Sequence, residues 1–350
     1  SAWKSQFFSG MMMPIMQFVG NLGYVMVALL GGVFVIKGSI EVGDIQSFFQ
    51  YIRNFTQPIQ QIAQVTNLLQ SSAAASERVF EFLEEEEEVQ QPEHPDSIEG
   101  LNGNVQFEHV EFGYNPDKII VHDFSADVHD GQKIAIVGPT GAGKTTMVKL
   151  LMRFYDVNKG AIKVDGHDVR NFNRSELHEM FGMVLQDTWL FSGTIMENIR
   201  YGRLDATDEE VIAAAKAAHI HSFIMQQPGG YQMVLDEETS NISQGQKQLL
   251  TIARAILADN KILILDEATS SVDTRTEMQI QKAMDNLMKG RTSFVIAHRL
   301  STIKDADLIL VMKDGDIIEQ GDHEELLAAK GFYADLYNSQ FDNGSSELCS

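Results

Sequence analysis

The sequence Lys133-Ile-Ala-Ile-Val137 runs directly into Gly138-Pro-Thr-Gly-Ala-Gly-Lys-Thr-Thr146, and this junction decides the fold. The second stretch matches G-x-x-x-x-G-K-[ST] and is called the phosphate loop (residues 138–146) below. It lies between an apolar run that predicts a buried strand and a helical run, Met147 to Arg153. Glycines let the N–H groups of such a loop converge on phosphate, and the following helix N-terminus adds positive potential. The junction therefore predicts an α/β domain that binds a nucleotide.

Two residues of the phosphate loop have specific expected roles. The Lys144 ammonium is expected to reach the β and γ phosphates of ATP, and the Thr145 hydroxyl is expected to ligate Mg²⁺. ATP and Mg²⁺ are thus the expected cofactors. The loop residues expected to bind ATP are Gly138, Pro139, Thr140, Gly141, Ala142, Gly143, Lys144, Thr145 and Thr146.

Three further aliphatic runs are bounded by polar residues or glycine. They cover residues 262–265, 293–297 and 308–311. Continuous aliphatic runs of this length suit strands that are buried on both faces, several of them parallel. Together with the helical stretches between them, they predict a sheet with helices on its faces.

Two carboxylates end the first of these runs. Asp266 is placed to hold a hydrated Mg²⁺ indirectly, and Glu267 is placed to orient or deprotonate an attacking water. Two adjacent acids after a strand can also cap a helix. Their position downstream of a phosphate loop favours nucleotide chemistry.

A polar turn, Asn241-Ile242-Ser243-Gln244-Gly245-Gln246, lies upstream of the same strand and is called the signature turn (residues 241–246). It resembles the signature sequence of ATP-binding cassette (ABC) proteins, although Ile242 stands for Leu and Gln244 for the first of two glycines. In that family the turn binds an ATP held mainly by a second subunit. The resemblance implies a dimer in which four residues contact the partner's ATP: Ser243, Gln244, Gly245 and Gln246.

Residues 101–340 as a whole resemble the nucleotide-binding domain of an ABC exporter, an α/β P-loop NTPase fold. The resemblance implies that Tyr114 stacks on adenine, that Gln186 senses Mg²⁺ and touches the transmembrane part, and that His298 contacts the γ-phosphate. It places Asp273, in Ser271-Val272-Asp273, at the opposite subunit. The implied catalytic residues are Glu267, His298 and Gln186, and the implied metal-site residues are Thr145, Gln186 and Asp266. Glu237 matches a contact to coupling helices, although Asp236 and Thr239 replace the usual glycines.

The sequence of the N-terminal part predicts a transmembrane hairpin of helices, an all-α fold. Residues 5–36 carry no charged side chain, and as a helix they would be about 48 Å long, enough to cross a bilayer. A polar turn, Lys37 to Asp44, leads to a second helix from Ile45 towards Arg78. The hairpin resembles the last two of six transmembrane helices in ABC exporters. We therefore expect further helices upstream of this sequence.

The second helix carries a stripe of amides besides its apolar stripe. These amides either line a substrate path or form a polar seam between helices. Arg53 would cost about 2.5 to 3.5 kcal/mol in lipid on insertion scales, so it is expected to face a partner or water. Pro58 is expected to bend the helix or remove one of its hydrogen bonds.

The net charge of −22 argues against a nucleic-acid partner, because phosphate backbones are bound by clustered Lys and Arg. The acidic run Glu84 to Glu88 predicts a solvated linker, and the lone Cys349 excludes an intrachain disulfide. The expected division is a transmembrane fragment (1–83), a linker (84–100), an ABC ATP-binding domain (101–340) and a flexible tail (341–350).

The resemblance implies ATP-driven export of amphipathic or hydrophobic substrates, drugs or lipids, by a homodimer or heterodimer. The expected location is the plasma membrane, in contact with lipid, with the nucleotide-binding domain in the cytoplasm. Peptide export is an alternative. A soluble ABC ATPase acting on ribosomes or DNA would lack the hairpin. Regulatory halves in the family usually lose the residue corresponding to Glu267 or His298, and both are present here.

Overall fold

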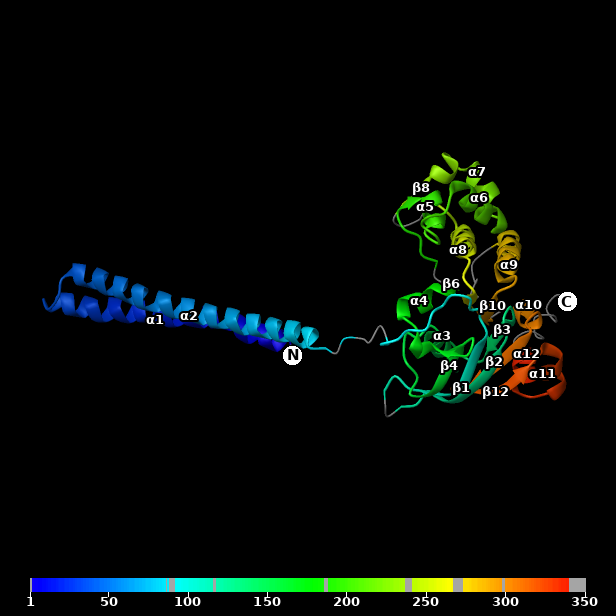
Figure 1. Ribbon diagram of the computed structural model, residues 1–350. Helices are drawn as coiled ribbons and strands as arrows, with labels where there is room; N and C mark the ends of the chain where they lie inside the picture. The colour runs from blue at the N-terminus through cyan, green and yellow to red at the C-terminus, as the bar shows by residue number, and fades with distance from the viewer. Residues whose placement is uncertain are drawn as a thin grey trace, which may run out of the picture. The chain divides into compact units, whose positions relative to one another are not determined.

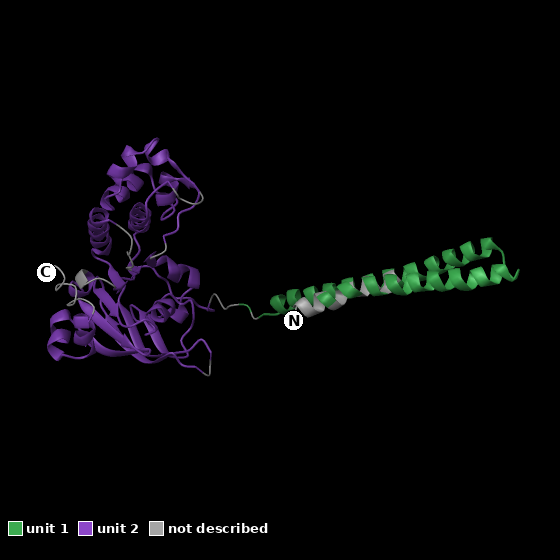
Figure 2. Cartoon of the chain, turned by 180° about the vertical axis from the view of Figure 1, so that it is seen from behind, with its two compact units in different colours: residues 1–88 green, residues 89–350 purple. Residues whose placement is uncertain are grey.

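The structure, a computed structural model, divides the chain into two compact units, residues 1–88 and 89–350 (Figure 2). It describes residues 2–85, 87, 92–115, 118–185, 188–236, 241–266, 273–297 and 300–339. The units are taken one at a time below.

Unit 1 is a hairpin of two long helices, α1 (Ala2–Ile36) and α2 (Val42–Leu83) (Figure 1). Glycines on α1 let the two helices pack closely: a Cβ on Gly31 would lie only 2.8 Å from the Ile45 side chain. The helix expected to begin near Ile45 begins at Val42 instead, where the Glu41 N–H donates to the Asp44 carboxylate at 2.9 Å. That bond satisfies a donor at the helix start and so extends the helix into the polar turn.

Only one segment of the described hairpin is long and apolar enough to cross a membrane by composition. It is Gln17–Ile36 within α1. Two membrane-spanning helices were expected from the resemblance, whereas hydropathy identifies one. The second helix, α2, is not identified because its amides and charges lower its hydropathy.

The central sheet of unit 2 has the strand order β12-β11-β3-β10-β9-β6. All neighbours pair in parallel except β12, which is antiparallel to β11. The four strands expected from the sequence all lie in this sheet, as predicted. The strands are β3 (Lys133–Val137), β6 (Phe181–Val184), β9 (Ile262–Asp266), β10 (Thr292–Ile296), β11 (Leu308–Lys313) and β12 (Asp316–Gly321).

Alternate residues of the central strand β9 pack into two different hydrophobic clusters. Ile262 and Ile264 of β9 pack in a cluster with α3 (Lys144–Leu151), whereas Leu263 and Leu265 pack in a cluster with α8 (Gln244–Ala258) and α9 (Thr274–Met288). Because side chains alternate across a strand, both faces of the sheet are covered, which is why the strand reads as continuously aliphatic.

A second, antiparallel sheet was not anticipated from the sequence. Its order is β2-β1-β4-β5, and its apolar face joins the cluster that contains α3. The strands are β1 (Val105–Phe112), β2 (Val121–Val128), β4 (Lys159–Val164) and β5 (His167–Asp168), and a two-stranded sheet joins β7 (Gly193–Thr194) to β8 (Val234–Leu235).

Helices α5 to α8 stand together as a lobe at one end of unit 2, while α3 lies among the strands (Figure 1). The remaining helices are α4 (Arg174–Glu179), α5 (Ile195–Arg200), α6 (Asp208–Ala217), α7 (His221–Gln226), α10 (Leu300–Lys304), α11 (His323–Ala329), α12 (Phe332–Tyr337), and the short 3-10 turns η1 (Val169–Asn171) and η2 (Gly230–Gln232).

Candidate functional site

The phosphate loop joins β3 to α3 and depends on glycine. Gly143 is the N-cap of α3 with φ 100°, so the helix begins at Lys144, three residues before the predicted run. Gly138 leaves β3 with φ 154°, and a Cβ there would lie 2.3 Å from the carbonyl oxygen of Met312 on β11. Only glycine fits this close approach between loop and strand. The tip of the loop, residues 139–141, is exposed.

Lys144 folds back over this loop. Its Nζ donates to the carbonyl oxygens of Gly138 at 2.7 Å and Pro139 at 3.0 Å. Burial lowers the pKa of Lys144, and the charge of Asp266 partly opposes that shift. The structure therefore brings Lys144 and Asp266 within electrostatic reach of each other. An anionic phosphate would offer the ammonium a stronger acceptor than the two carbonyls.

The first turn of α3 presents its two threonines differently. Thr145 is exposed at the end of the loop, whereas Thr146 is buried and lies 3.4 Å from the Tyr114 hydroxyl. Tyr114 itself is 42% exposed and is braced by the rings of Phe112 and Tyr155, each with its centroid 5.0 Å away. An exposed, braced ring beside the loop fits the predicted adenine-stacking role. Sequence reasoning did not find Tyr155, because it lies after α3 with no motif around it.

Asp266 ends β9, half-buried, at the edge where several parallel strands finish together. Its partner in the register is Ile296 on β10, and Val184 on β6 pairs with the preceding Leu265. The strands that precede the predicted residues Gln186, Glu267 and His298 are therefore adjacent. These three residues themselves lie outside the described residues, as does Glu237.

The described residues offer few groups that could ligate a metal ion. Among the described residues no group of three or more His, Cys, Asp or Glu is arranged to hold a metal ion. Mg²⁺ usually keeps several waters and takes only one or two protein carboxylates together with phosphate oxygens. Asp266 and the exposed Thr145 hydroxyl at the phosphate loop fit that requirement.

The signature turn opens helix α8. Ser243 is its N-cap: the Gln246 N–H points at the Ser243 hydroxyl at 3.4 Å, and the Ser243 N–H donates to the Gln246 amide oxygen at 2.8 Å. Gln244 donates to the Thr188 hydroxyl at 3.1 Å, while Gly245 is buried. The Ser243 hydroxyl is exposed and lies at a helix N-terminus, which is favourable for binding an anion.

Asp273 has a local role that sequence reasoning missed. Its carboxylate accepts the Thr276 N–H at 3.0 Å and so caps α9. This hydrogen bonding lowers the pKa of the Asp273 carboxyl. The side chain is exposed, as a contact to another subunit requires.

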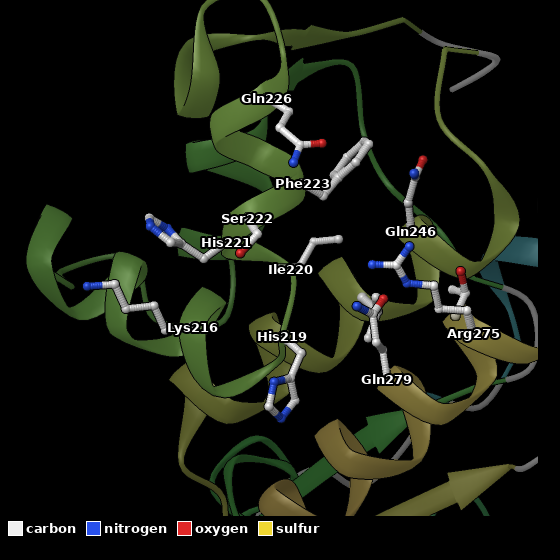
Figure 3. A pocket seen from close by; sticks show the side chains of 12 residues that line it. Lys216, His219, Ile220, His221, Ser222, Phe223, Gln226, Gln246, Arg275 and Gln279 are labelled. Carbon is white, nitrogen blue, oxygen red and sulfur yellow. The ribbon is translucent and has the colours of Figure 1, made fainter.

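A polar cavity of about 470 Å³ borders the signature turn (Figure 3). Gln246 of the turn and Arg275 and Gln279 of α9 line one side of it, and α7 lines the other. The cavity lies apart from the phosphate loop, none of whose residues line it.

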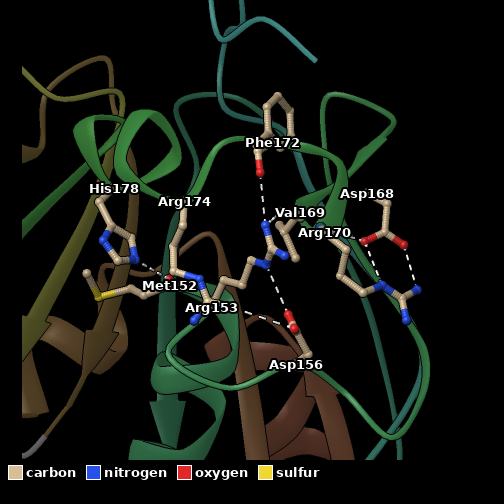
Figure 4. A network of polar contacts seen from close by, with 9 residues as sticks. All are labelled: Met152, Arg153, Asp156, Asp168, Val169, Arg170, Phe172, Arg174 and His178. Atoms are coloured by element: carbon tan, nitrogen blue, oxygen red, sulfur yellow. Dashed lines mark hydrogen bonds and ion pairs between the residues drawn. The ribbon is translucent and has the colours of Figure 1, made fainter. Parts of the chain in front are cut away.

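A buried arginine holds the segment after α3 in place (Figure 4). Arg153 is 4% exposed and donates to the carbonyl oxygens of Val169 at 3.2 Å and Phe172 at 2.9 Å, as well as to the Asp156 carboxylate at 3.0 Å. The buried cation thus makes three hydrogen bonds, one of them to a carboxylate, which offset the cost of its burial. It fixes the end of the phosphate-loop helix to η1, in the segment that leads to α4 and β6.

Comparison with known proteins agrees with this geometry. Residues 121–270 match the family model described as ABC transporter, and residues 1–59 match the one described as ABC transporter transmembrane region. The chain is 36% identical to a bacterial Atm1-family ABC exporter solved with ATP bound, with a TM-score of 0.70 over 97% of this chain and 59% of that one.

Curated relatives align with nearly the whole of this chain. A fatty acid ABC transporter ATP-binding/permease protein of Mycobacterium bovis is 54% identical over 95% of this chain and 52% of its own length. An ATP-dependent lipid A-core flippase of Desulfotalea psychrophila is 43% identical over 93% of this chain and 57% of its own. The chain spans about half the length of the curated relatives it matches. The chain belongs to the ABC transporter family, exporter type, and joins part of a transmembrane region to a nucleotide-binding domain.

Proposed function

We propose that this chain is one half of a dimeric exporter in which ATP is clamped between the phosphate loop of one nucleotide-binding domain and the signature turn of another. The second domain comes from a second copy or a related half. The proposal is supported by two separate groups of residues in unit 2, each suited to contact phosphate. Lys144 and Asp266 form one at the end of the sheet, and exposed Ser243 forms the other at the start of α8.

In this scheme Lys144 and the loop N–H groups hold the phosphates, and Tyr114 stacks on adenine. Thr145, Asp266 and Gln186 would hold Mg²⁺, which would supply positive charge to neutralise the phosphates. Across the dimer, Ser243 and the N-terminus of α8 bind the γ-phosphate, and Asp273 touches the opposite subunit. Glu267 orients the attacking water and His298 contacts the γ-phosphate, so catalysis is mainly positioning and charge stabilisation.

ATP drives transport because it binds the closed arrangement more tightly than the open one, which shifts the equilibrium between them. Closure moves the transmembrane helices, and hydrolysis releases the clamp. The proposed location is the plasma membrane, with the nucleotide-binding domain in the cytoplasm.

The substrate we propose is an amphipathic or hydrophobic molecule, a lipid or a drug. The names of relatives support this class: fatty acid transport, lipid A-core flipping and, for a Bacillus subtilis relative that is 43% identical, multidrug export. The apolar α1 and the amide-bearing α2 offer surfaces for both parts of such a molecule.

The test is Glu267→Gln in the complete, reconstituted transporter. The variant is expected to lose ATP turnover, to keep ATP binding and to accumulate the closed dimer. Glu209→Gln, an exposed carboxylate on α6, is the matched control and should hydrolyse ATP normally. Undiminished hydrolysis by Glu267→Gln would remove that residue from the proposed site.

A further inference from the structure

Arg53 lies at a polar hollow in the transmembrane hairpin. The hollow has a volume of about 410 Å³ and opens between the two helices of unit 1. Its lining consists of Gln17, Gly20, Asn21 and Tyr24 from α1 and Arg53, Thr56 and Gln57 from α2.

The packing of the helices fixes the level of Arg53 along α1. A Cβ on Gly20 would lie 3.8 Å from Thr56, and one on Gly23 would lie 4.0 Å from Ile52, so Arg53 is level with residues 20–23. These residues belong to the membrane-crossing segment Gln17–Ile36. At 1.5 Å per residue, Gly23 is about 20 Å from Ile36. Arg53 is therefore inside the membrane-spanning part, where an uncompensated charge is unfavourable.

The hairpin itself offers no anion to compensate this charge. Residues 5–36 are uncharged, and Arg53 is the sole charged residue between Asp44 and Glu77. Asp44 lies about 13 Å away along α2, and its carboxylate already accepts the Glu41 N–H. Among residues 2–85 that the structure describes, Arg53 takes part in no ion pair. The rest of the lining is neutral, and every lining residue except Gly20 has a side chain that can form hydrogen bonds.

We infer that this hollow binds the anionic headgroup, carboxylate or phosphate, of an amphiphilic substrate. The inference rests on the proposed function and narrows its substrate class. A guanidinium forms bidentate hydrogen bonds to either group, and the low dielectric of the surrounding bilayer would strengthen them. The amides of Gln17, Asn21 and Gln57 and the Tyr24 hydroxyl supply further donors beside it. The Tyr24 ring packs on Phe49 with centroids 5.4 Å apart, which provides an apolar wall for the start of the hydrocarbon chain.

The test measures binding and ATPase stimulation in the complete transporter, reconstituted in phosphatidylcholine nanodiscs. The probes are dodecanoate, dodecyl phosphate and the neutral dodecanol, together with the short anions acetate and inorganic phosphate. We expect the two anionic amphiphiles to bind and stimulate at lower concentration than dodecanol, and the short anions to have no effect.

Arg53→Gln should raise the half-stimulating concentration of dodecanoate and dodecyl phosphate by about 10- to 100-fold, which is about 1.4 to 2.8 kcal/mol. It should leave the response to dodecanol unchanged. Arg53→Lys should retain part of the anion response. Arg78→Gln removes the same charge from α2 outside the hollow and should have no effect.

Four outcomes would overturn the inference. The first is that Arg53→Gln binds dodecanoate normally, and the second is that it weakens the binding of dodecanoate and dodecanol equally. The third is stimulation of the ATPase by acetate or phosphate alone. The fourth is that Arg53→Gln loses thermal stability and basal ATPase activity and that Arg53→Lys restores both. The last result would mean that Arg53 pairs with an acidic side chain of another helix. Failure of the proposed function would differ from all of these, because the unaltered transporter would then lack basal ATP hydrolysis.

Discussion

Ser243→Ala separates the helix-capping role of the signature turn from its proposed role at the partner's ATP. In the structure the Ser243 hydroxyl accepts one hydrogen bond, from the Gln246 N–H at 3.4 Å, while remaining exposed. The substitution removes only that oxygen. It leaves the Ser243 N–H bonded to the Gln246 side chain at 2.8 Å.

The two roles predict effects of different size. Losing an N-cap hydroxyl typically costs about 1 kcal/mol, and the long bond here places the loss at about 0.5–1 kcal/mol. Helix α8 should persist because its buried face, including Leu249, Leu250 and Ile252, anchors it. For a domain of this size the melting temperature should fall by about 1–4 °C. A lost hydrogen bond to a charged phosphate is worth about 1.5–3 kcal/mol, and so about 10- to 150-fold in ATP turnover at limiting ATP.

The assay compares ATPase rate and thermal unfolding for Ser243→Ala and Thr207→Ala. Thr207 is the N-cap of α6 and accepts the Glu210 N–H at 3.3 Å in the same kind of capping box. Both variants should lose similar stability, whereas only Ser243→Ala should lose turnover. The reasoning is refuted if Ser243→Ala hydrolyses ATP as fast as Thr207→Ala.

Three other substitutions test the structure. Gly138→Ala should weaken ATP binding and lower the free energy of unfolding by about 1–3 kcal/mol, because the added Cβ would meet the Met312 carbonyl. Gly131→Ala is the control, since Gly131 also has a positive φ (74°) but faces open space. This control should bind ATP normally when binding is measured by equilibrium titration. Arg153→Met should lower the unfolding free energy in urea by about 3 kcal/mol, since two buried carbonyls lose their donor; a loss no larger than that of the more exposed Arg170→Met would contradict this. Burial raises the pKa of Tyr231 to about 12, above the ordinary value near 10, so folded-state stability should fall as pH rises from about 10 to 12; melting curves of Tyr231→Phe should show a smaller fall.

The strands and the phosphate loop were predictable because local sequence dictates them. The runs at 133–137 and 262–265 are aliphatic on both faces, and Gly138 and Gly143 permit backbone angles that other residues resist. The antiparallel sheet was not predictable in the same way. Strand β2 mixes buried and exposed residues and includes four polar side chains, a composition that is also ordinary for a loop. Only its long-range pairing with β1 therefore defines it as a strand.

The site was predicted mainly by resemblance, and its supporting contacts were not. Asp273 and Ser243 were selected as contacts across a dimer, and the structure adds that both cap helices. Arg153 belongs to no motif. Its structural role depends on hydrogen bonds to two carbonyl groups that come from a later segment of the chain. Such contacts depend on the tertiary arrangement, which a residue pattern does not encode.

The most direct test of the central claim is the nucleotide content of a mixed dimer after ATP and orthovanadate. One subunit carries both Lys144→Ala and Ser243→Ala, and the other subunit is unaltered. If each ATP is shared between a phosphate loop and the opposite signature turn, each site carries one lesion, so no nucleotide should be retained. If each subunit held its ATP alone, both lesions would fall in one site and the other site would stay whole, so one nucleotide would be retained per dimer.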